Sequence, residues 1–179
     1  MVAKAPMKKT EKGFTPSGDG WFVIHASEAP WHRSRELGAI CSLQGETRFS
    51  DFGVNIRVIE PGQPACLYHR ENAQEDFLVL SGECRVLIEE QEIPLKAGHF
   101  VHRPAGTNHV FVGAGDGPSA ILMIGHRPPK HELCYPVSEL AAKYRASAEE
   151  ETPDPRVAYG KFSEWEGNAD PLWPPAEWE

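Results

Sequence analysis

Short apolar runs with an alternating pattern occupy the middle of the chain. In the segment 53–59, apolar side chains recur at every second position, which is the period of an extended strand. Pro61-Gly62 ends this run. Alternate residues fall on opposite faces, one with Val54, Ile56 and Val58 and the other with Asn55, Arg57 and Ile59.

Similar short runs follow at close spacing and predict further strands. Ser81-Gly82 separates two of them, and we expect a tight hairpin around Gly82. Upstream, we expect strands over 21–25 and 39–43, with a loop at 30–33. The later runs cover 77–80, 85–88, 93–95, 100–103, 109–112 and 120–125.

About seven short strands therefore fall between residues 53 and 126, a number typical of a β-sandwich or barrel. No alternation of strands with helices appears, which disfavours a parallel nucleotide-binding sheet. We divide the chain into a flexible arm over 1–19, an all-β barrel over 20–135, and a C-terminal extension over 136–179.

The C-terminal extension has two parts. Apolar positions at helical spacing predict a helix over 137–148. The remainder is rich in proline and contains Trp165, Trp173 and Trp178. We expect it to pack as an extended tail on the barrel or on a second subunit.

Charge and composition narrow the choice of partners. The net charge of −8 makes the chain a poor candidate for binding nucleic acid. No apolar stretch reaches the roughly 18 residues of a membrane span, and no apolar run follows the first lysines. We therefore expect a cytoplasmic protein without membrane contact. Its four cysteines show no metal-binding spacing, and we expect free thiols.

Candidate chemistry is concentrated between Gly62 and Gly113. His69 and Glu71 would share one face of an extended segment, Glu75 begins the next strand, and His109 follows a Pro-x-Gly turn. If these strands curl into one barrel, the side chains can converge in its interior. Two histidines and one carboxylate match the facial triad that leaves open positions on a divalent ion.

The same residues resemble the two motifs of the cupin superfamily. The first motif runs Gly, five residues, His-x-His, three or four residues, Glu, six residues, Gly; the second runs Gly, five residues, Pro-x-Gly, two residues, His, three residues, Asn. Residues 54–125 carry both motifs, with Gly62, His69, Glu75 and Gly82 in the first and Gly98, Pro104, Gly106 and His109 in the second.

Three departures separate this chain from the motifs. Six residues lie between Gly62 and His69, Glu71 replaces the second histidine, and Gly113 replaces the asparagine. The resemblance implies a jelly-roll β-barrel and a divalent metal on His69, Glu75 and His109, with Glu71 as a candidate fourth ligand. The alternative is that Glu71 points away or pairs with Arg70 or Arg103. Such a donor set suits Mn²⁺ or Fe²⁺, while Zn²⁺ and Ni²⁺ stay open. A barrel without metal is the alternative.

Other residues are weaker candidates. The aromatic side chains of this region are mostly expected in the core, and one or two of them would line a ligand cavity. His99 and His102 point to opposite faces of a strand and cannot both join one site. The pocket candidates are Tyr68, Phe77, Phe100, His102 and Phe111.

The sequence leaves two main functions open. The resemblance implies a metal-dependent enzyme acting on a small molecule, of the oxygenase, isomerase or epimerase, or lyase type. The alternative is a non-catalytic module that binds or senses a small molecule. A storage protein is disfavoured because storage cupins usually contain two barrels. We also expect a homodimer, with the apolar segment 21–24 and the tryptophan-rich tail as candidate surfaces.

Overall fold

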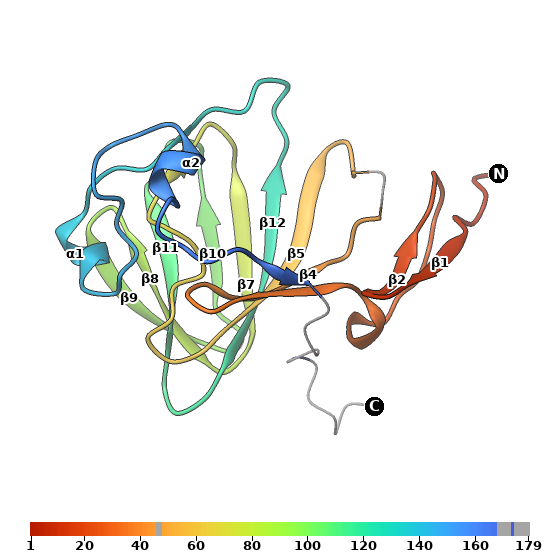
Figure 1. Ribbon diagram of the computed structural model, residues 1–179, viewed down its shortest axis with the longest axis horizontal. Coiled ribbons are helices and arrows are strands. Elements are labelled where there is room, and N and C mark those ends of the chain that lie inside the picture. Colours follow the sequence, from red (N-terminus) through yellow and green to blue (C-terminus); the bar gives the residue numbers. More distant parts are fainter. Residues whose placement is uncertain (46–47, 168–172, 174–179) are drawn as a thin grey trace.

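The computed structural model describes residues 1–45, 48–167 and 173. Two antiparallel sheets form the body of the molecule (Figure 1). In spatial order, the larger sheet contains β10 (Phe100–Arg103), β7 (Glu75–Ser81), β12 (Ser119–His126), β5 (Phe52–Ile59), β4 (Gly38–Ser42), β3 (Trp31–Ser34) and β14 (Glu166–Gly167). The smaller sheet contains β11 (His109–Ala114), β8 (Glu83–Ile88) and β9 (Gln91–Lys96).

The main core lies between these sheets. Alternate residues of β5, β7 and β12 meet alternate residues of the smaller sheet, as the period of two requires. Its buried members are Ile59, Ala65, Phe77, Val79, Cys84, Val86, Leu95, Phe111 and Ile121. The expected all-β jelly-roll barrel is therefore confirmed.

Additional layers cover the outer faces. Trp31, Cys41 and Ile56 belong to a second core on the outer face of the larger sheet. On the smaller sheet, Leu87 and Val110 pack with Ala141 of α1 (Glu139–Ala142). A two-stranded sheet of β6 (Arg70–Glu71) and β13 (Leu133–Cys134) completes one end of the barrel. Across the described ranges, no helix is long and apolar enough to cross a bilayer.

The chain around Gly82 differs from the expected hairpin. β7 pairs with β10 and β12, whereas β8 pairs with β9 and β11, so the chain crosses from one sheet to the other at Gly82. Gly82 has φ of +71°, and a Cβ there would lie 2.4 Å from the carbonyl oxygen of Pro118. Both conditions require glycine. A glycine at this position is therefore consistent with a crossing between sheets as well as with a hairpin.

The N-terminal region also differs from the prediction. Residues expected to form a flexible arm contain a hairpin of β1 (Met7–Thr10) and β2 (Gly13–Pro16), which lies beside the barrel in Figure 1. In the segment 21–25, only Trp21 pairs, through a bridge to Lys4. The expected loop 30–33 instead enters β3, because Trp31 is buried and pairs with Cys41.

The C-terminal extension contains less helix than its periodicity predicts. The expected helix over 137–148 shortens to α1, which Ser138 caps by accepting a hydrogen bond from the Ala141 amide. Arg145 adopts φ of +58°, which stops the helical path. The turn of α2 (Pro155–Ala158) follows, and a short 3₁₀ turn, η1, spans Ala26–Glu28. Trp173 packs against the outer core, and Trp178 lies outside the described residues.

Candidate metal centre

His69 and His109 form the centre of the candidate site. Their backbones exchange two hydrogen bonds, 3.1 Å from the His69 amide and 2.9 Å from the His109 amide. Residues paired in this way project their side chains to the same face of the sheet. The two imidazole rings consequently lie with their centroids 4.7 Å apart.

Glu75 joins the two histidines from β7. Its Oε2 atom lies 3.3 Å from Nε2 of His109. One ligand atom from each of His69, Glu75 and His109 fits within a mutual separation of 4.8 Å. The neighbouring strand makes room for the carboxylate, since a Cβ on Gly125 would lie 3.3 Å from Oε1 of Glu75.

The surrounding groups orient His69 and leave one nitrogen of His109 unsatisfied. Nδ1 of His69 lies 2.8 Å from the Leu67 carbonyl oxygen, so this nitrogen donates and Nε2 is directed to the site. Nδ1 of His109 is buried and has no hydrogen-bond partner among the described residues. Two imidazoles and a carboxylate, with one ring held by a backbone carbonyl, fit a divalent ion in both chemistry and spacing.

Arg103 lies directly behind this group and is fully buried. Its Nη2 atom donates to Oε2 of Glu75 at 2.5 Å and to Oε1 of Glu71 at 3.1 Å. The second carboxylate oxygen of Glu71 lies 2.5 Å from Nε2 of His131. Glu71, the fourth candidate ligand, is thus engaged by Arg103 and His131 and lies outside the group of three.

From the sequence, Arg103 is expected only as an alternative partner of Glu71, and His131 is not expected at the site. Arg103 immediately precedes Pro104 at the end of β10, so its position within the second motif was a usable signal. His131 lies after the barrel strands, and its contact with Glu71 depends on how the segment before β13 folds back. Spacing along the chain carries no sign of that contact.

The electrostatics of the centre follow from burial and from neighbouring charges. Burial and the charge of His109 lower the pKa of His69 to about 3. Burial raises the pKa of Glu75, but hydrogen bonding and charge from His109, together with the charge of Arg103, lower it to about 2. Burial and the charge of Glu75 raise the pKa of Glu71. At neutral pH the centre therefore holds a neutral His69 and an ionised Glu75.

A cavity of about 520 Å³ inside the barrel opens onto this group. Phe77 and Phe111 line it beside His69, Glu75 and His109, and Cys66 approaches Nδ1 of His69 to 3.7 Å. Burial raises the pKa of the Cys66 thiol to about 12, so this cysteine stays protonated.

The other pocket candidates lie elsewhere. Tyr68 is buried outside the cavity and accepts a hydrogen bond from the Glu90 amide. Phe100 is 63% exposed. His102 is on the surface, where its Nδ1 lies 2.7 Å from Asp76. These three side chains do not line the cavity.

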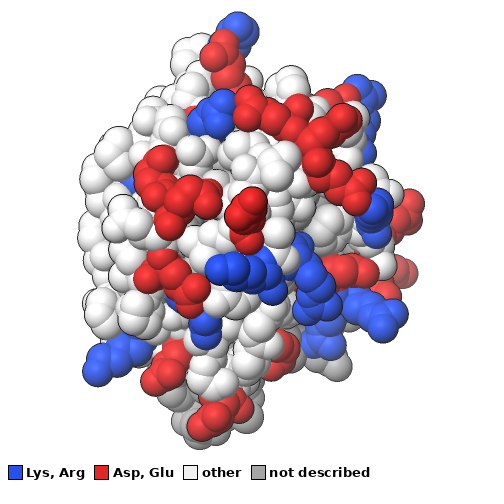
Figure 2. All heavy atoms as spheres, turned by 90° about the vertical axis from the view of Figure 1, so that its left-hand side faces the viewer, with Lys and Arg blue, Asp and Glu red and all other residues white. Residues whose placement is uncertain are grey.

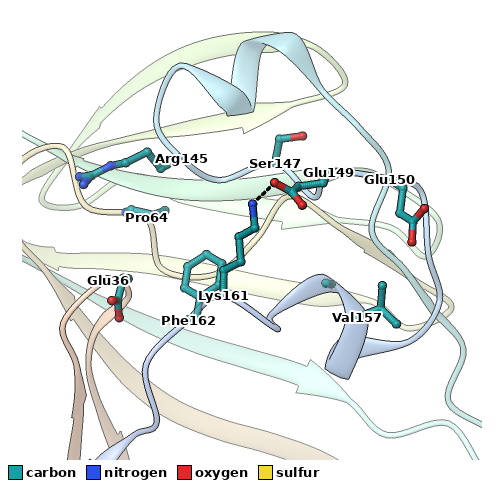
Figure 3. Close-up of a pocket in the computed structure, with 10 residues that line it drawn as sticks. Glu36, Pro64, Arg145, Ser147, Glu149, Glu150, Val157, Lys161 and Phe162 are labelled. Atoms are coloured by element: carbon teal, nitrogen blue, oxygen red, sulfur yellow. Dashed lines mark hydrogen bonds and ion pairs between the residues drawn. The ribbon is translucent and has the colours of Figure 1, made fainter.

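A larger hollow of about 700 Å³ lies outside the barrel, between the loop at Pro64 and the segment around α2 (Figure 3). Lys161 reaches across it to pair with Glu149. None of the three residues of the candidate centre lines this hollow. On the face that carries β9 and α1, basic and acidic side chains are intermixed (Figure 2). The inward-facing cavity is therefore the place where metal-binding chemistry and space for a ligand coincide.

Comparisons with known proteins agree with this architecture. Residues 55–125 match the family model described as Cupin domain. A predicted oxalate decarboxylase from Thermotoga maritima aligns over 60% of this chain and 100% of its own, with 20% identity and a TM-score of 0.53. The polyketide cyclase RemF from Streptomyces resistomycificus aligns over 62% of this chain and 83% of its own, with 16% identity and a TM-score of 0.54. These two likenesses establish the fold.

A third solved structure is more similar in sequence. It is a sugar phosphate isomerase from Silicibacter pomeroyi, described as from a cupin superfamily, with 30% identity and a TM-score of 0.49. The match covers 53% of this chain and 62% of that protein, so it spans less than two thirds of the isomerase. A search of curated protein sequences found no match.

Proposed function

We propose that this chain, a member of the cupin superfamily through its barrel domain, binds one divalent metal ion and acts on a small molecule in the barrel. His69, Glu75 and His109 would hold the ion. The proposal rests on one observation, the convergence of their ligand atoms within 4.8 Å at the wall of the barrel cavity.

The donor set limits the choice of metal. Two imidazole nitrogens and a carboxylate oxygen suit Mn²⁺, Fe²⁺, Zn²⁺ or Ni²⁺, and the lack of a thiolate disfavours softer ions. Such an ion supplies Lewis acidity and open positions for a substrate or dioxygen. Oxygenase, isomerase or epimerase, and lyase reactions all fit this chemistry, and the shared fold does not choose among them.

The residues around the centre have separate roles in this proposal. The Leu67 carbonyl holds the tautomer of His69, and Arg103 fixes the carboxylate of Glu75. Phe77 and Phe111 would provide an apolar wall beside the ion.

One observation favours the alternative of a binding module without metal. Glu75 already accepts a hydrogen bond from Arg103 at 2.5 Å, and His109 lies 3.3 Å away. The carboxylate is therefore compensated without an added cation, and the positive charge of Arg103 opposes one. A barrel that only binds a small molecule would retain this arrangement.

The metal content of the purified protein distinguishes the metal-dependent function from the binding module without metal. We would purify the untagged protein without chelator and measure bound metals by elemental mass spectrometry, with His69→Ala and His109→Ala beside it. The expected result is near-stoichiometric metal, lost in both variants and retained in His102→Ala, which changes a surface histidine. Less than about a tenth of an equivalent in the unchanged protein, without uptake on adding metals, would favour the binding module.

A further inference from the structure

The cavity wall carries positive charge that no carboxylate in the described part of the chain compensates. Arg48, Arg57 and Arg127 line the cavity together with the candidate centre. None of them takes part in an ion pair with another described residue. The two carboxylates of the cavity, Glu71 and Glu75, are both engaged by Arg103. The remaining cations therefore have no partner of opposite charge among the described residues that line this wall.

Among these arginines, Arg57 has the most unusual position, because it occupies an inward-facing site on a strand. On β5, its neighbours Ile56 and Val58 face the outer core, while Ile59 faces the core between the sheets. Arg57 shares the inward face with Ile59, since side chains alternate along a strand. An arginine thus occupies an inward position where the strand pattern calls for an apolar residue.

The guanidinium of Arg57 is poorly satisfied at this position. Nε and Nη1 are buried and make no hydrogen bond within the described part of the chain. Burial lowers the pKa of Arg57, although arginine stays charged at neutral pH. The side chain as a whole is half-buried, and the indole of Trp165 lies 5.2 Å from Cζ, a contact that offsets part of the cost of removing a cation from water. The two buried nitrogens stay costly without a hydrogen-bond acceptor.

Asn55 provides a second polar group beside Arg57. It lies two residues earlier on the same inward face and also lines the cavity. Its side-chain oxygen is buried without a hydrogen-bond partner among the residues described. An amide oxygen accepts a hydrogen bond from a hydroxyl or amine, so the two side chains together offer donors for an anion and an acceptor beside it.

Arg127 and Arg48 add further positive charge to the same cavity. Arg127 donates to the carbonyl oxygen of Phe49 at 2.6 Å and to Oε1 of Gln44 at 2.7 Å, which are both neutral acceptors. Burial and the charge of Arg48 lower the pKa of Arg127, so these two guanidiniums are close enough to repel each other. An anion in the cavity would reduce this repulsion.

We propose that Arg57 and Asn55 form an anion subsite, which binds the carboxylate or phosphate group of a small molecule whose remainder faces the candidate metal centre. Arg57 would supply the charge-assisted hydrogen bonds and Asn55 a contact to an adjacent hydroxyl. The inference rests on the proposed function for the role of the cavity, and it narrows the substrate to a small organic acid or phosphate ester.

Anion binding can be measured without metal. We would titrate chelator-treated protein by calorimetry with glycerol 1-phosphate and with malate, and with the uncharged counterparts glycerol and butane-1,2,4-triol. At least one anion is expected to bind while its counterpart does not. The phosphate and carboxylate arms tell the two chemical classes apart. If no anion binds more tightly than its counterpart, the inference is overturned.

Two variants assign the binding to the subsite. Arg57→Gln should lower the affinity for the anion about tenfold or more, which is the loss expected when a hydrogen bond to a charged group is removed. Asn55→Asp should do the same without loss of side-chain volume, because its carboxylate would neutralise Arg57. Arg156→Gln removes an arginine that is exposed and paired with Asp154, and it should leave binding unchanged. Retained affinity in both cavity variants would refute the subsite.

Further comparisons separate this inference from its alternatives. Arg57 also contacts Trp165, so Trp165→Leu tests whether this contact alone explains the effect of Arg57. We expect Trp165→Leu to retain anion binding. Loss of anion binding in Trp165→Leu would refute the subsite. His69→Ala should still bind the anion in metal-free protein. Anion binding that survives in a protein unable to hold metal supports the subsite while the proposed metal function fails. Stoichiometric metal without anion binding would support the proposed metal function and refute the anion subsite.

Discussion

His69 and His109 face each other across an antiparallel bridge, exchanging both backbone hydrogen bonds with their ring centroids 4.7 Å apart. The bridge fixes the separation of the two backbones, and the Leu67 carbonyl holds the ring of His69, so this ring loses little side-chain freedom on binding an ion. The site is therefore organised by the fold before any ligand arrives.

Arg103 should be essential for stability. Arg103→Met leaves the carboxylates of Glu71 and Glu75 without their common partner, and we expect a loss of about 3–5 kcal/mol in the free energy of unfolding. Urea denaturation measures it. Arg70→Met is the control, because its ion pair with Glu151 is largely exposed, and it should cost about 1 kcal/mol or less. Equal losses in both variants would contradict the role of Arg103.

The metal-free protein should lose stability in acid through His69. Unfolded His69 takes up a proton near its ordinary pKa of 6.5, whereas folded His69 does so only at about 3. Between these values the unfolded state binds more protons, so the free energy of unfolding falls as pH drops, by up to about 1.4 kcal/mol per unit.

Denaturation with urea across this pH range tests the assignment. His69→Ala should lose the slope that corresponds to this proton. Val79→Ala weakens the core without removing a titrating group and should keep the slope. An unchanged slope in His69→Ala would show that other groups cause the acid sensitivity.

Gly125 and Gly53 are partners across β12 and β5 and form a matched pair for testing the centre. A Cβ at Gly125 would press on the Glu75 carboxylate at 3.3 Å, so Gly125→Ala should weaken metal binding about tenfold. At Gly53 the nearest atom is Nη2 of Arg127 at 3.4 Å, the end of a flexible side chain. Competition with a fluorescent chelator measures both affinities, and Gly53→Ala should match the unchanged protein.

Tyr159 ties the C-terminal segment to the barrel. Its hydroxyl accepts a hydrogen bond of 3.0 Å from the amide of Leu67, which is fully buried. Tyr159→Phe should cost about 1–3 kcal/mol, because a buried donor loses its acceptor. Tyr144→Phe alters a hydroxyl bonded to Glu92 at the surface and should cost less in the same denaturation assay. The reverse order would mean that this segment contributes little to stability.

The homodimer stays a prediction with a defined surface. Trp21 is 53% exposed and Val23 81% exposed on the same short segment. Val23→Asp should lower the mass measured by light scattering to that of one chain, since burying a charge at an apolar contact is costly. Val157→Asp changes another exposed valine and should keep the dimer. A single-chain mass for the unchanged protein at micromolar concentration would reject the dimer.

The sequence by itself determined the barrel and the three residues of the candidate centre. Its period of two and its turn residues are local properties, which a pattern along the chain can express. The three residues of the centre followed from the resemblance of residues 54–125 to the two cupin motifs. Local patterns also failed in specific places. Gly82 signalled a turn but not that the chain changes sheets there, and the helical spacing after residue 137 did not reveal the positive φ of Arg145.

Only the tertiary structure decided which charges meet. Arg103 lies between Glu71 and Glu75, His131 reaches Glu71, and Arg57 faces the cavity without a counter-charge from any residue that the structure describes. Each of these relationships joins residues on different strands or on a strand and a returning loop. The cost or gain of a buried charge depends on what lies within a few ångströms in space, and that distance is set by the closure of the barrel.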